Sequence, residues 1–175
     1  FDFTAAELDG CPSSYLAERL QPDGETYRCT LKYPCYVPLM ENCKVAATRR
    51  TMEFAFNCRC KDENGAILGT PVELRHEKAK LMGYATHAAF VTEVRMSGGA
   101  AAVKDFLGGL ASKLRPLLES DVAALKALKR AELGDAAFAA DGSTLHAWDR
   151  AYYCKRLEEA RFEVDHEALR AYFPI

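Results

Sequence analysis

The sequence predicts a mainly α-helical protein with one short β element, and three observations support this fold class. Apolar residues recur every three or four positions between Val103 and Leu128, as on one face of a helix. After residue 48, capping residues and glycine-containing turns divide most of the chain into segments of the length of ordinary helices. A single run, residues 25–33, alternates with the period of two that is typical of a half-buried strand.

The first third of the chain is predicted to consist of short elements. Thr4 and Glu7 have the spacing of a capping box, which predicts a short helix that Gly10 ends. Pro12 suits the first turn of a second helix, which reaches residue 20. After a turn at residues 22–24 comes the predicted strand, which Pro34 ends and whose apolar face carries Tyr27, Cys29, Leu31 and Tyr33.

Three helices are predicted in the middle of the chain. Thr48 is expected to cap a helix over residues 49–60, which the polar turn at residues 62–65 ends. A second helix is expected over residues 71–83, and Thr86 is expected to cap a third helix that continues to residue 96.

The longest predicted helix follows the turn at residues 97–99 and carries the apolar stripe from Val103 to Leu128. Pro116 lies inside this stripe, so we expect a kink or a short break there. A polar turn at residues 141–143 leads to a helix with several aromatic residues, and Asp165 is expected to cap a last helix to residue 172. Because there is no internal repeat or linker, residues 1–175 are predicted to form one domain or part of one.

The composition of the 175 residues, 49% hydrophobic and 27% charged, is that of an ordinary globular domain. The formal net charge is −2, so neither nucleic acid nor an anionic membrane surface is expected as a partner. No run approaches the roughly 20 consecutive apolar residues of a membrane span. Seven cysteines, an odd number, predict free thiols and a reducing, cytoplasmic location.

No set of residues in the sequence forms a complete metal site. His76-Glu77 and His166-Glu167 begin like the H-E-x-x-H zinc motif, but Lys80 and Arg170 stand where the second histidine is needed. Cys58-Arg59-Cys60 lacks the second cysteine pair of a zinc knuckle. We therefore predict neither a metal nor a catalytic residue within this chain.

Two smaller groups of residues allow a structural and a functional interpretation. Tyr152 and Tyr153 share neighbouring helical turns with Trp148, and such an aromatic stripe forms either core or a ligand surface. Cys58 and Cys60 stand next to Arg59 and Lys61, which favour a thiolate. At least one of the two thiols is therefore expected to be accessible and reactive; the alternative is a pair of inert, half-buried thiols.

Several segments resemble the central part of the thimet oligopeptidase and neurolysin family of zinc metallopeptidases. In the first two thirds of the chain they are Thr30-Leu31-Lys32-Tyr33-Pro34, Thr48-Arg49-Arg50, Phe56-Asn57-Cys58-Arg59-Cys60-Lys61 and Thr86-His87-Ala88. In the last third they are Ala147-Trp148-Asp149 with Tyr152-Tyr153, Glu158-Glu159 with Arg161, Val164-Asp165 and Tyr172-Phe173-Pro174. The resemblance covers essentially the whole chain in order.

The resemblance implies a zinc endopeptidase that cleaves short peptides in a channel between mainly helical domains. The H-E-x-x-H motif of the family lies downstream of the counterpart of Ile175, so the implied zinc belongs to the full-length parent. The chain begins with Phe1 rather than Met, and we expect it to be an excised, inactive piece of the scaffold that frames the channel. Asp149, Tyr152 and Tyr153 are candidates for residues that line the channel.

The sequence leaves other readings open. The chain is alternatively a non-catalytic helical module that binds peptides or proteins, or a truncated paralogue. Gly69-Thr70-Pro71 and Gly108-Gly109 depart from helices that are continuous in relatives, which puts the local helix boundaries in doubt. A piece of a larger scaffold is also expected to leave apolar helix faces uncovered, namely the stripe from Val103 to Leu128 and the face with Trp148 and Tyr152. Such a piece either self-associates through these faces or is only marginally stable. The alternative is a true domain with its own closed core.

Overall fold

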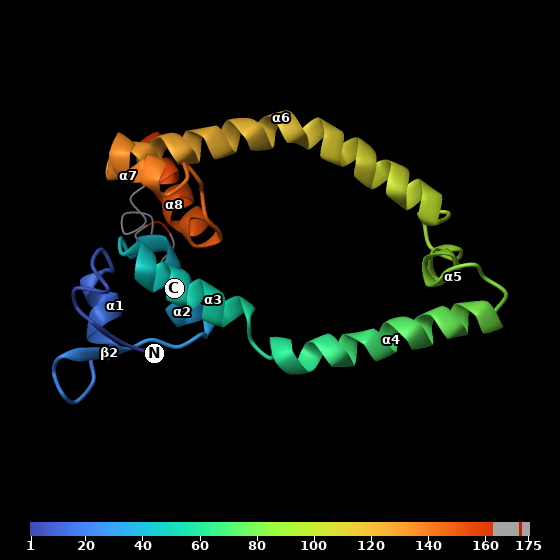
Figure 1. Ribbon diagram of the computed structural model, residues 1–175, viewed down its shortest axis with the longest axis horizontal. Coiled ribbons are helices and arrows are strands. Elements are labelled where there is room, and N and C mark those ends of the chain that lie inside the picture. Colours follow the sequence, from blue (N-terminus) through green and yellow to red (C-terminus); the bar gives the residue numbers. More distant parts are fainter. Residues whose placement is uncertain (163–171, 173–175) are drawn as a thin grey trace. The chain divides into compact units, whose positions relative to one another are not determined.

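The computed structural model describes residues 1–162 and residue 172, and most of them are helical (Figure 1). In chain order the elements are β1 (Asp2–Thr4), α1 (Ser13–Ala17), β2 (Thr26–Arg28), α2 (Tyr33–Asn42), α3 (Ala46–Asn57), α4 (Lys61–Leu81), α5 (His87–Thr92), α6 (Ala100–Leu133), α7 (Asp135–Ala140), the 3-10 helix η1 (Ala147–Asp149) and α8 (Arg150–Arg161). The predicted mainly α-helical class is confirmed. No helix among these residues combines the length and the apolar character that crossing a membrane requires.

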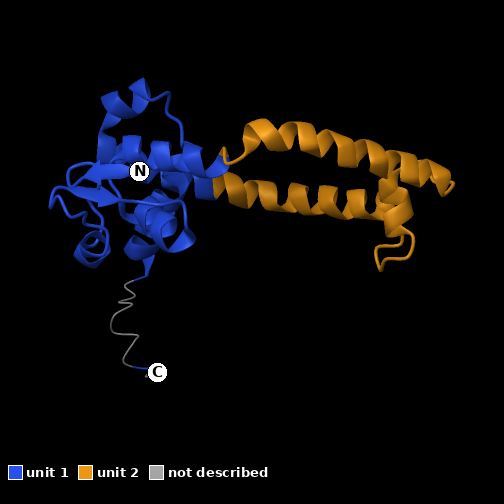
Figure 2. Cartoon of the chain, turned by 90° about the horizontal axis from the view of Figure 1, so that it is seen from below, with its two compact units in different colours: residues 1–57, 121–175 blue, residues 58–120 orange. Residues whose placement is uncertain are grey.

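The chain divides into two compact units, which Figure 2 distinguishes by colour. Unit 1 consists of residues 1–57 and 121–175, so it is built from both ends of the chain. Unit 2 consists of residues 58–120 and contains α4, α5 and the first part of α6.

The β element of unit 1 is smaller than the sequence predicts. β2 covers residues 26–28 instead of 25–33, and it pairs antiparallel with β1, a strand that was not predicted, with Phe3 opposite Tyr27. The prediction failed after residue 28 because Pro34 lies in the first turn of α2 and Lys32 is the N-cap of that helix. Proline fixes a backbone angle that suits a helix start as well as it ends a strand.

The predicted helix after Thr4 is replaced by turns, although its capping box is present. The backbone N–H and the hydroxyl of Thr4 donate to the Glu7 carboxylate at 2.8 and 2.9 Å. Gly10 ends this segment with a φ of +92°, and a Cβ at that position would lie 2.5 Å from the backbone oxygen of Asn42. Close approach to α2 therefore requires glycine here.

The core of unit 1 lies under these short elements and contains nine buried residues: Phe3, Leu8, Tyr15, Cys29, Cys35, Leu39, Met40, Cys43 and Met52. A second buried cluster joins Leu125 of α6 to Tyr152 and Tyr153 of α8. α8 also packs against α2, and η1 packs against α3. Segments far apart in the sequence thus share one interior.

Helix boundaries around residue 60 differ from the prediction. α3 already begins at Ala46, and the Thr48 side chain donates to the backbone oxygen of Glu7 at 2.7 Å instead of capping a helix. The break falls at Cys60, whose φ of +55° is left-handed, and residues 62–65 lie inside α4. Asp62 and Glu63 suit the first turn of a helix because carboxylates favour its positive end.

The downstream helices are present, but their bounds differ from the prediction. α4 begins at Lys61 instead of residue 71 and continues through Gly69 and Pro71. The break considered at Pro116 is absent, since α6 continues through this residue. The predicted cap at Thr86 is confirmed, since its hydroxyl accepts from the Ala89 N–H at 3.1 Å, although α5 ends at Thr92. The helix predicted for residues 165–172 lies outside the described residues except for Tyr172.

The apolar stripe of α6 is covered in one unit and uncovered in the other. In unit 1, Leu125 is buried and Leu128 is half-buried against α8. In unit 2, the same stripe is exposed at Leu107, Leu110, Leu114 and Leu117. α4 also carries exposed apolar side chains: Ile67, Leu68, Val72 and Leu74.

We expect the chain to self-associate through the exposed stripe of α6, because contiguous apolar surface favours contact with a second apolar surface. Sedimentation over a concentration series should give an average mass that rises with concentration. Replacing Leu114 and Leu117 with Gln should weaken association about tenfold or more, since each buried leucine contributes about 1.5–3 kcal/mol. Lys113→Gln on the same helix is the matched control, and a mass independent of concentration would contradict the expectation.

Candidate functional site

The centre of the candidate site in unit 1 is the carboxylate of Asp149, which is completely buried. Its Oδ1 accepts a hydrogen bond from Nη2 of Arg49 at 2.8 Å. Its Oδ2 accepts from Nζ of Lys129 at 2.6 Å and from the backbone N–H of His146 at 3.2 Å. A buried charge is costly unless it is paired and hydrogen-bonded, and Asp149 meets both conditions.

Arg49 reaches this carboxylate from α3, and its guanidinium is 2% exposed. Nη1 donates to the backbone oxygens of Cys43 and Lys44 at 2.7 and 2.9 Å, and Nε donates to that of Trp148 at 3.1 Å. The guanidinium also lies over the ring of Tyr152, 4.3 Å from its centre. The planar group is therefore held on three sides and above a ring, which fixes its direction.

Lys129 reaches the same carboxylate from α6. Its ammonium makes three hydrogen bonds, to Oδ2 of Asp149, to Oδ2 of Asp141 at 2.5 Å and to the backbone oxygen of Thr144 at 2.8 Å. These use all three of its donor protons. Asp141 in turn lies 2.9 Å from Nε2 of His146. We call Arg49, Lys129, Asp141, His146 and Asp149 the buried charge network.

The network includes the one group of described residues that offers three possible metal ligands close together. Ligand atoms of Asp141, His146 and Asp149 lie within 4.8 Å of one another. The Lys129 ammonium already bonds to both carboxylates, so it supplies the positive charge that a metal ion would bring. The geometry therefore fits an ion cluster in which Lys129 bridges the two carboxylates, and it does not fit a divalent cation.

The three residues predicted to line a channel are part of this interior. Asp149 is 0% exposed, and Tyr152 and Tyr153 are each 2% exposed. The Tyr152 hydroxyl donates to Glu132 at 3.1 Å, and its ring meets that of Tyr153 edge-on. Burial raises the pKa of both tyrosines, so their hydroxyls remain protonated. The two tyrosines are core residues here; that they also shape a peptide channel stays a prediction.

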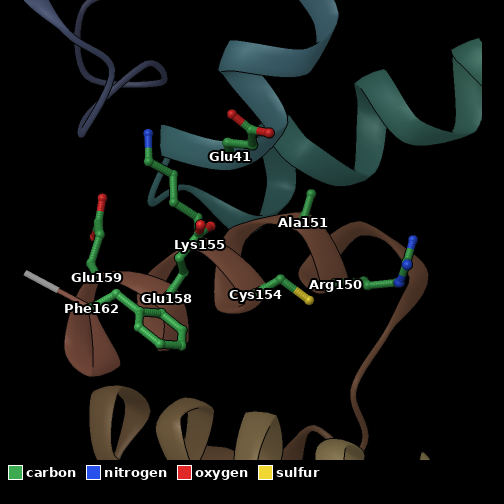
Figure 3. A pocket seen from close by; sticks show the side chains of 8 residues that line it. All are labelled: Glu41, Arg150, Ala151, Cys154, Lys155, Glu158, Glu159 and Phe162. Atoms are coloured by element: carbon green, nitrogen blue, oxygen red, sulfur yellow. The ribbon is translucent and has the colours of Figure 1, made fainter. Parts of the chain in front are cut away.

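Another side of α8 lines an open groove, which Figure 3 shows from close by. The groove has a volume of about 600 Å³, and it is lined by Glu41 of α2, by Arg150, Ala151, Cys154, Lys155, Glu158 and Glu159 of α8, and by Phe162. Lys155 donates to the side chain of Asn42 at 2.7 Å and so ties α8 to α2. The groove offers both signs of charge to a ligand.

Sequence reasoning missed this groove. Arg150, Cys154 and Glu158 are four residues apart, and residues at this spacing share one side of a helix. The spacing was visible in the sequence, but charged residues at such positions commonly face solvent. The position of Glu41 on a separate helix had no signal in the sequence.

The two candidate reactive thiols lie in unit 2, at the junction before α4. Cys60 is exposed and Cys58 is half-buried. Their reactivity stays a prediction. All seven cysteines of the chain are free.

Residues 39–175 match the family described as Peptidase family M3. The chain belongs to this family. It is 34% identical to a probable thimet oligopeptidase of Arabidopsis thaliana over 99% of its length, 34% identical to oligopeptidase A of Escherichia coli over 97%, and 32% identical to saccharolysin of Saccharomyces cerevisiae over 99%. These matches confirm the resemblance found in the sequence. The chain spans about a quarter of the length of these curated relatives, 23%, 26% and 25% respectively.

Asp149→Asn should destabilise this M3 family chain strongly, because two buried cations would lose their shared counter-charge. Breaking a buried ion pair from one side costs about 3–5 kcal/mol. The measurement is the free energy of unfolding in urea. Asp135→Asn is the matched control, since it removes one carboxylate from the exposed pair with Arg130 and should cost much less. Equal losses in the two variants would contradict a structural role for the network.

The hydrogen bonds of the Asp141 carboxylate lead to a prediction of how the free energy of unfolding changes with pH. Hydrogen bonds from Lys129 and then from His146 lower the pKa of the Asp141 carboxyl from its ordinary 3.8. A lowered carboxyl pKa stabilises the fold above the unfolded value and loses that effect as pH falls through the folded value. The free energy of unfolding should therefore fall below about pH 4, and less steeply in Asp141→Asn. Identical pH profiles would contradict this assignment.

Proposed function

We propose that the chain is an upstream part of the helical scaffold of a zinc-dependent oligopeptidase that cleaves short peptides. The family match and the names of the relatives, thimet oligopeptidase, oligopeptidase A and saccharolysin, support the peptidase activity. The seven free cysteines support a reducing compartment such as the cytoplasm.

The observation that carries the scaffold role is the burial of Asp149 between Arg49 and Lys129. This arrangement joins α3, α6 and η1, the 3-10 helix that leads into α8, and the protein itself supplies the hydrogen-bond partners of the three charged groups. Groups that act on a substrate need unfilled hydrogen-bonding capacity directed at it. The network is therefore best suited to fixing helices in place.

The surface that this scaffold offers to a ligand is the groove along α8. Arg150 and Lys155 suit carboxylates of a peptide, and Glu41, Glu158 and Glu159 suit its amino groups. In this proposal Asp149, Tyr152 and Tyr153 form the inner wall that holds the groove face of α8 in position.

Zinc is proposed as the cofactor of the full-length parent. In peptidases of this kind a bound zinc polarises the peptide carbonyl and activates water. Within the described residues, the cluster of Asp141, His146 and Asp149 does not fit zinc because Lys129 neutralises it. This chain therefore contributes helices and ligand contacts to the proposed enzyme.

A second candidate function is a non-catalytic module that binds peptides or proteins. The charged groove favours it, because such a groove can hold a peptide without cleaving it. The coding region downstream of this chain distinguishes the two functions. If it encodes H-E-x-x-H and the whole product cleaves short peptides in a chelator-sensitive way, the chain is part of a peptidase; a product that binds peptides uncleaved supports the module.

The isolated 175-residue chain is expected to retain no zinc and to cleave no peptide. Lys129 bonds to two of the three clustered groups, Asp141 and Asp149, and neither His76 nor His166 has a second histidine four residues later. Metal analysis after dialysis and a fluorogenic peptide assay measure the two quantities. Stoichiometric zinc, or peptidase activity that a chelator abolishes, would contradict this prediction.

A further inference from the structure

A second polar cluster in unit 1 surrounds the sulfur of Cys35, away from the buried charge network. The Cys35 side chain is almost buried, with 7% of the residue exposed. Its Sγ accepts hydrogen bonds from the backbone N–H of Thr30 at 3.2 Å and from Nε of Arg19 at 3.3 Å. The Tyr15 hydroxyl donates to the backbone oxygen of Cys35 at 3.0 Å and lies 3.4 Å from the same sulfur. A neutral thiol is a weak acceptor, so the two N–H donors, one of them on a guanidinium, suit a thiolate.

The position of Cys35 on its helix adds to this effect. Cys35 is the third residue of α2, a helix of ten residues with Lys32 as N-cap. The partial positive charge at the start of a helix stabilises a thiolate in the first turn. The guanidinium of Arg19 therefore acts together with the helix.

Arg19 is itself held rigidly in place. Its Nη1 donates to the backbone oxygen of Tyr15 at 2.7 Å, and its Nη2 donates to that of Pro34 at 3.2 Å. The guanidinium lies over the Tyr15 ring, 3.7 Å from the ring centre. Because each contact fixes the same plane, Nε remains directed at the sulfur of Cys35.

A second cysteine stands beside this sulfur. Cys29 is fully buried, and its Sγ lies 3.5 Å from the Tyr15 hydroxyl, the group that also contacts Cys35. The Thr30 N–H that binds the Cys35 sulfur belongs to the residue directly after Cys29. The two thiols therefore both contact the hydroxyl of the same tyrosine.

The two thiols differ in how readily they ionise. Burial opposes ionisation of Cys35, but hydrogen bonding with Tyr15, Arg19 and the Thr30 N–H outweighs it and lowers the pKa of this thiol. Burial raises the pKa of Cys29 to about 11, and the neighbouring charge of Cys35 adds to that rise. One thiol is thus prepared to attack, and the other is kept protonated next to it.

We propose that Cys35 and Cys29 form an oxidation site for a small uncharged peroxide, with Cys35 as the attacking thiolate and Cys29 as the resolving thiol. The Cys35 sulfur attacks one peroxide oxygen, the O–O bond breaks, and Cys35 becomes a sulfenic acid. Cys29 then attacks the Cys35 sulfur, the S–O bond breaks, and a disulfide forms. For hydrogen peroxide the two thiols lose two electrons and two protons in total, and the peroxide becomes two water molecules.

The first test is the pH dependence of alkylation of the reduced chain by iodoacetamide, a small uncharged reagent, with each cysteine quantified by mass spectrometry. The midpoint for Cys35 should lie below that of the same residue in urea-unfolded chain, and burial slows the rate without moving this midpoint. Arg19→Gln should raise the midpoint by about one pH unit. Arg28→Gln, which removes an exposed arginine paired with Asp2, is the matched control and should leave it unchanged.

The second test is oxidation with one equivalent of hydrogen peroxide. The expected product is a peptide pair with a Cys29–Cys35 disulfide, two hydrogens lighter than the reduced pair. Cys29→Ser should instead leave a Cys35 sulfenic acid that dimedone traps, and circular dichroism establishes that this variant is folded. The alkylation midpoint of Cys35 can be measured without any variant, and a midpoint equal to that of the unfolded chain would overturn the proposal. So would oxidation confined to the exposed Cys60 and Cys154.

Discussion

The burial of one carboxylate, that of Asp149, is the constraint on which unit 1 depends. It lies between Arg49 and Lys129, which are 100 and 20 residues away in the sequence. Replacing such a buried ion cluster with apolar residues is often neutral or stabilising, so the network is weak evidence for high stability. Its consequence is specificity, because any other packing of α3, α6 and α8 would leave a buried charge without its partner.

This constraint also decides which part of α8 is available to a ligand. Tyr152, Tyr153 and the carboxylate that precedes the helix are committed to the interior, where their polar atoms meet Glu132, Arg49 and Lys129. Positions on another side of the helix, Arg150, Cys154 and Glu158, line the groove beside α2. The chemistry of the groove therefore follows from the burial of the opposite positions and from the period of the helix.

The sequence predicted those parts of the fold that depend on local chemistry. The stripe of α6 and the cap at Thr86 are properties of neighbouring residues, and both are present. β1 was missed because a strand of three residues forms through its pairing with β2 and has little signal of its own. The start of α2 was misread because Pro34 suits a helix start as well as a strand end. The partners of Asp149 were missed because no spacing rule joins residues 100 apart.

The two units of this M3 family chain differ in how far their apolar side chains are buried. Unit 1 contains a buried apolar core and, beside it, the buried charge network. In unit 2, residues 58–120, Ala79 is the only buried apolar residue. Helices in proteins gain most of their stability from the packing of an apolar face. In α4 and the first part of α6, apolar side chains are exposed instead. The helical hydrogen bonds of unit 2 are therefore expected to open more readily than those of unit 1, because local stability follows buried contact. If another apolar surface covered the stripe of α6, the local stability of this helix would rise and that difference would become smaller. The stability of α6 in unit 2 therefore depends on whether a partner surface covers the stripe.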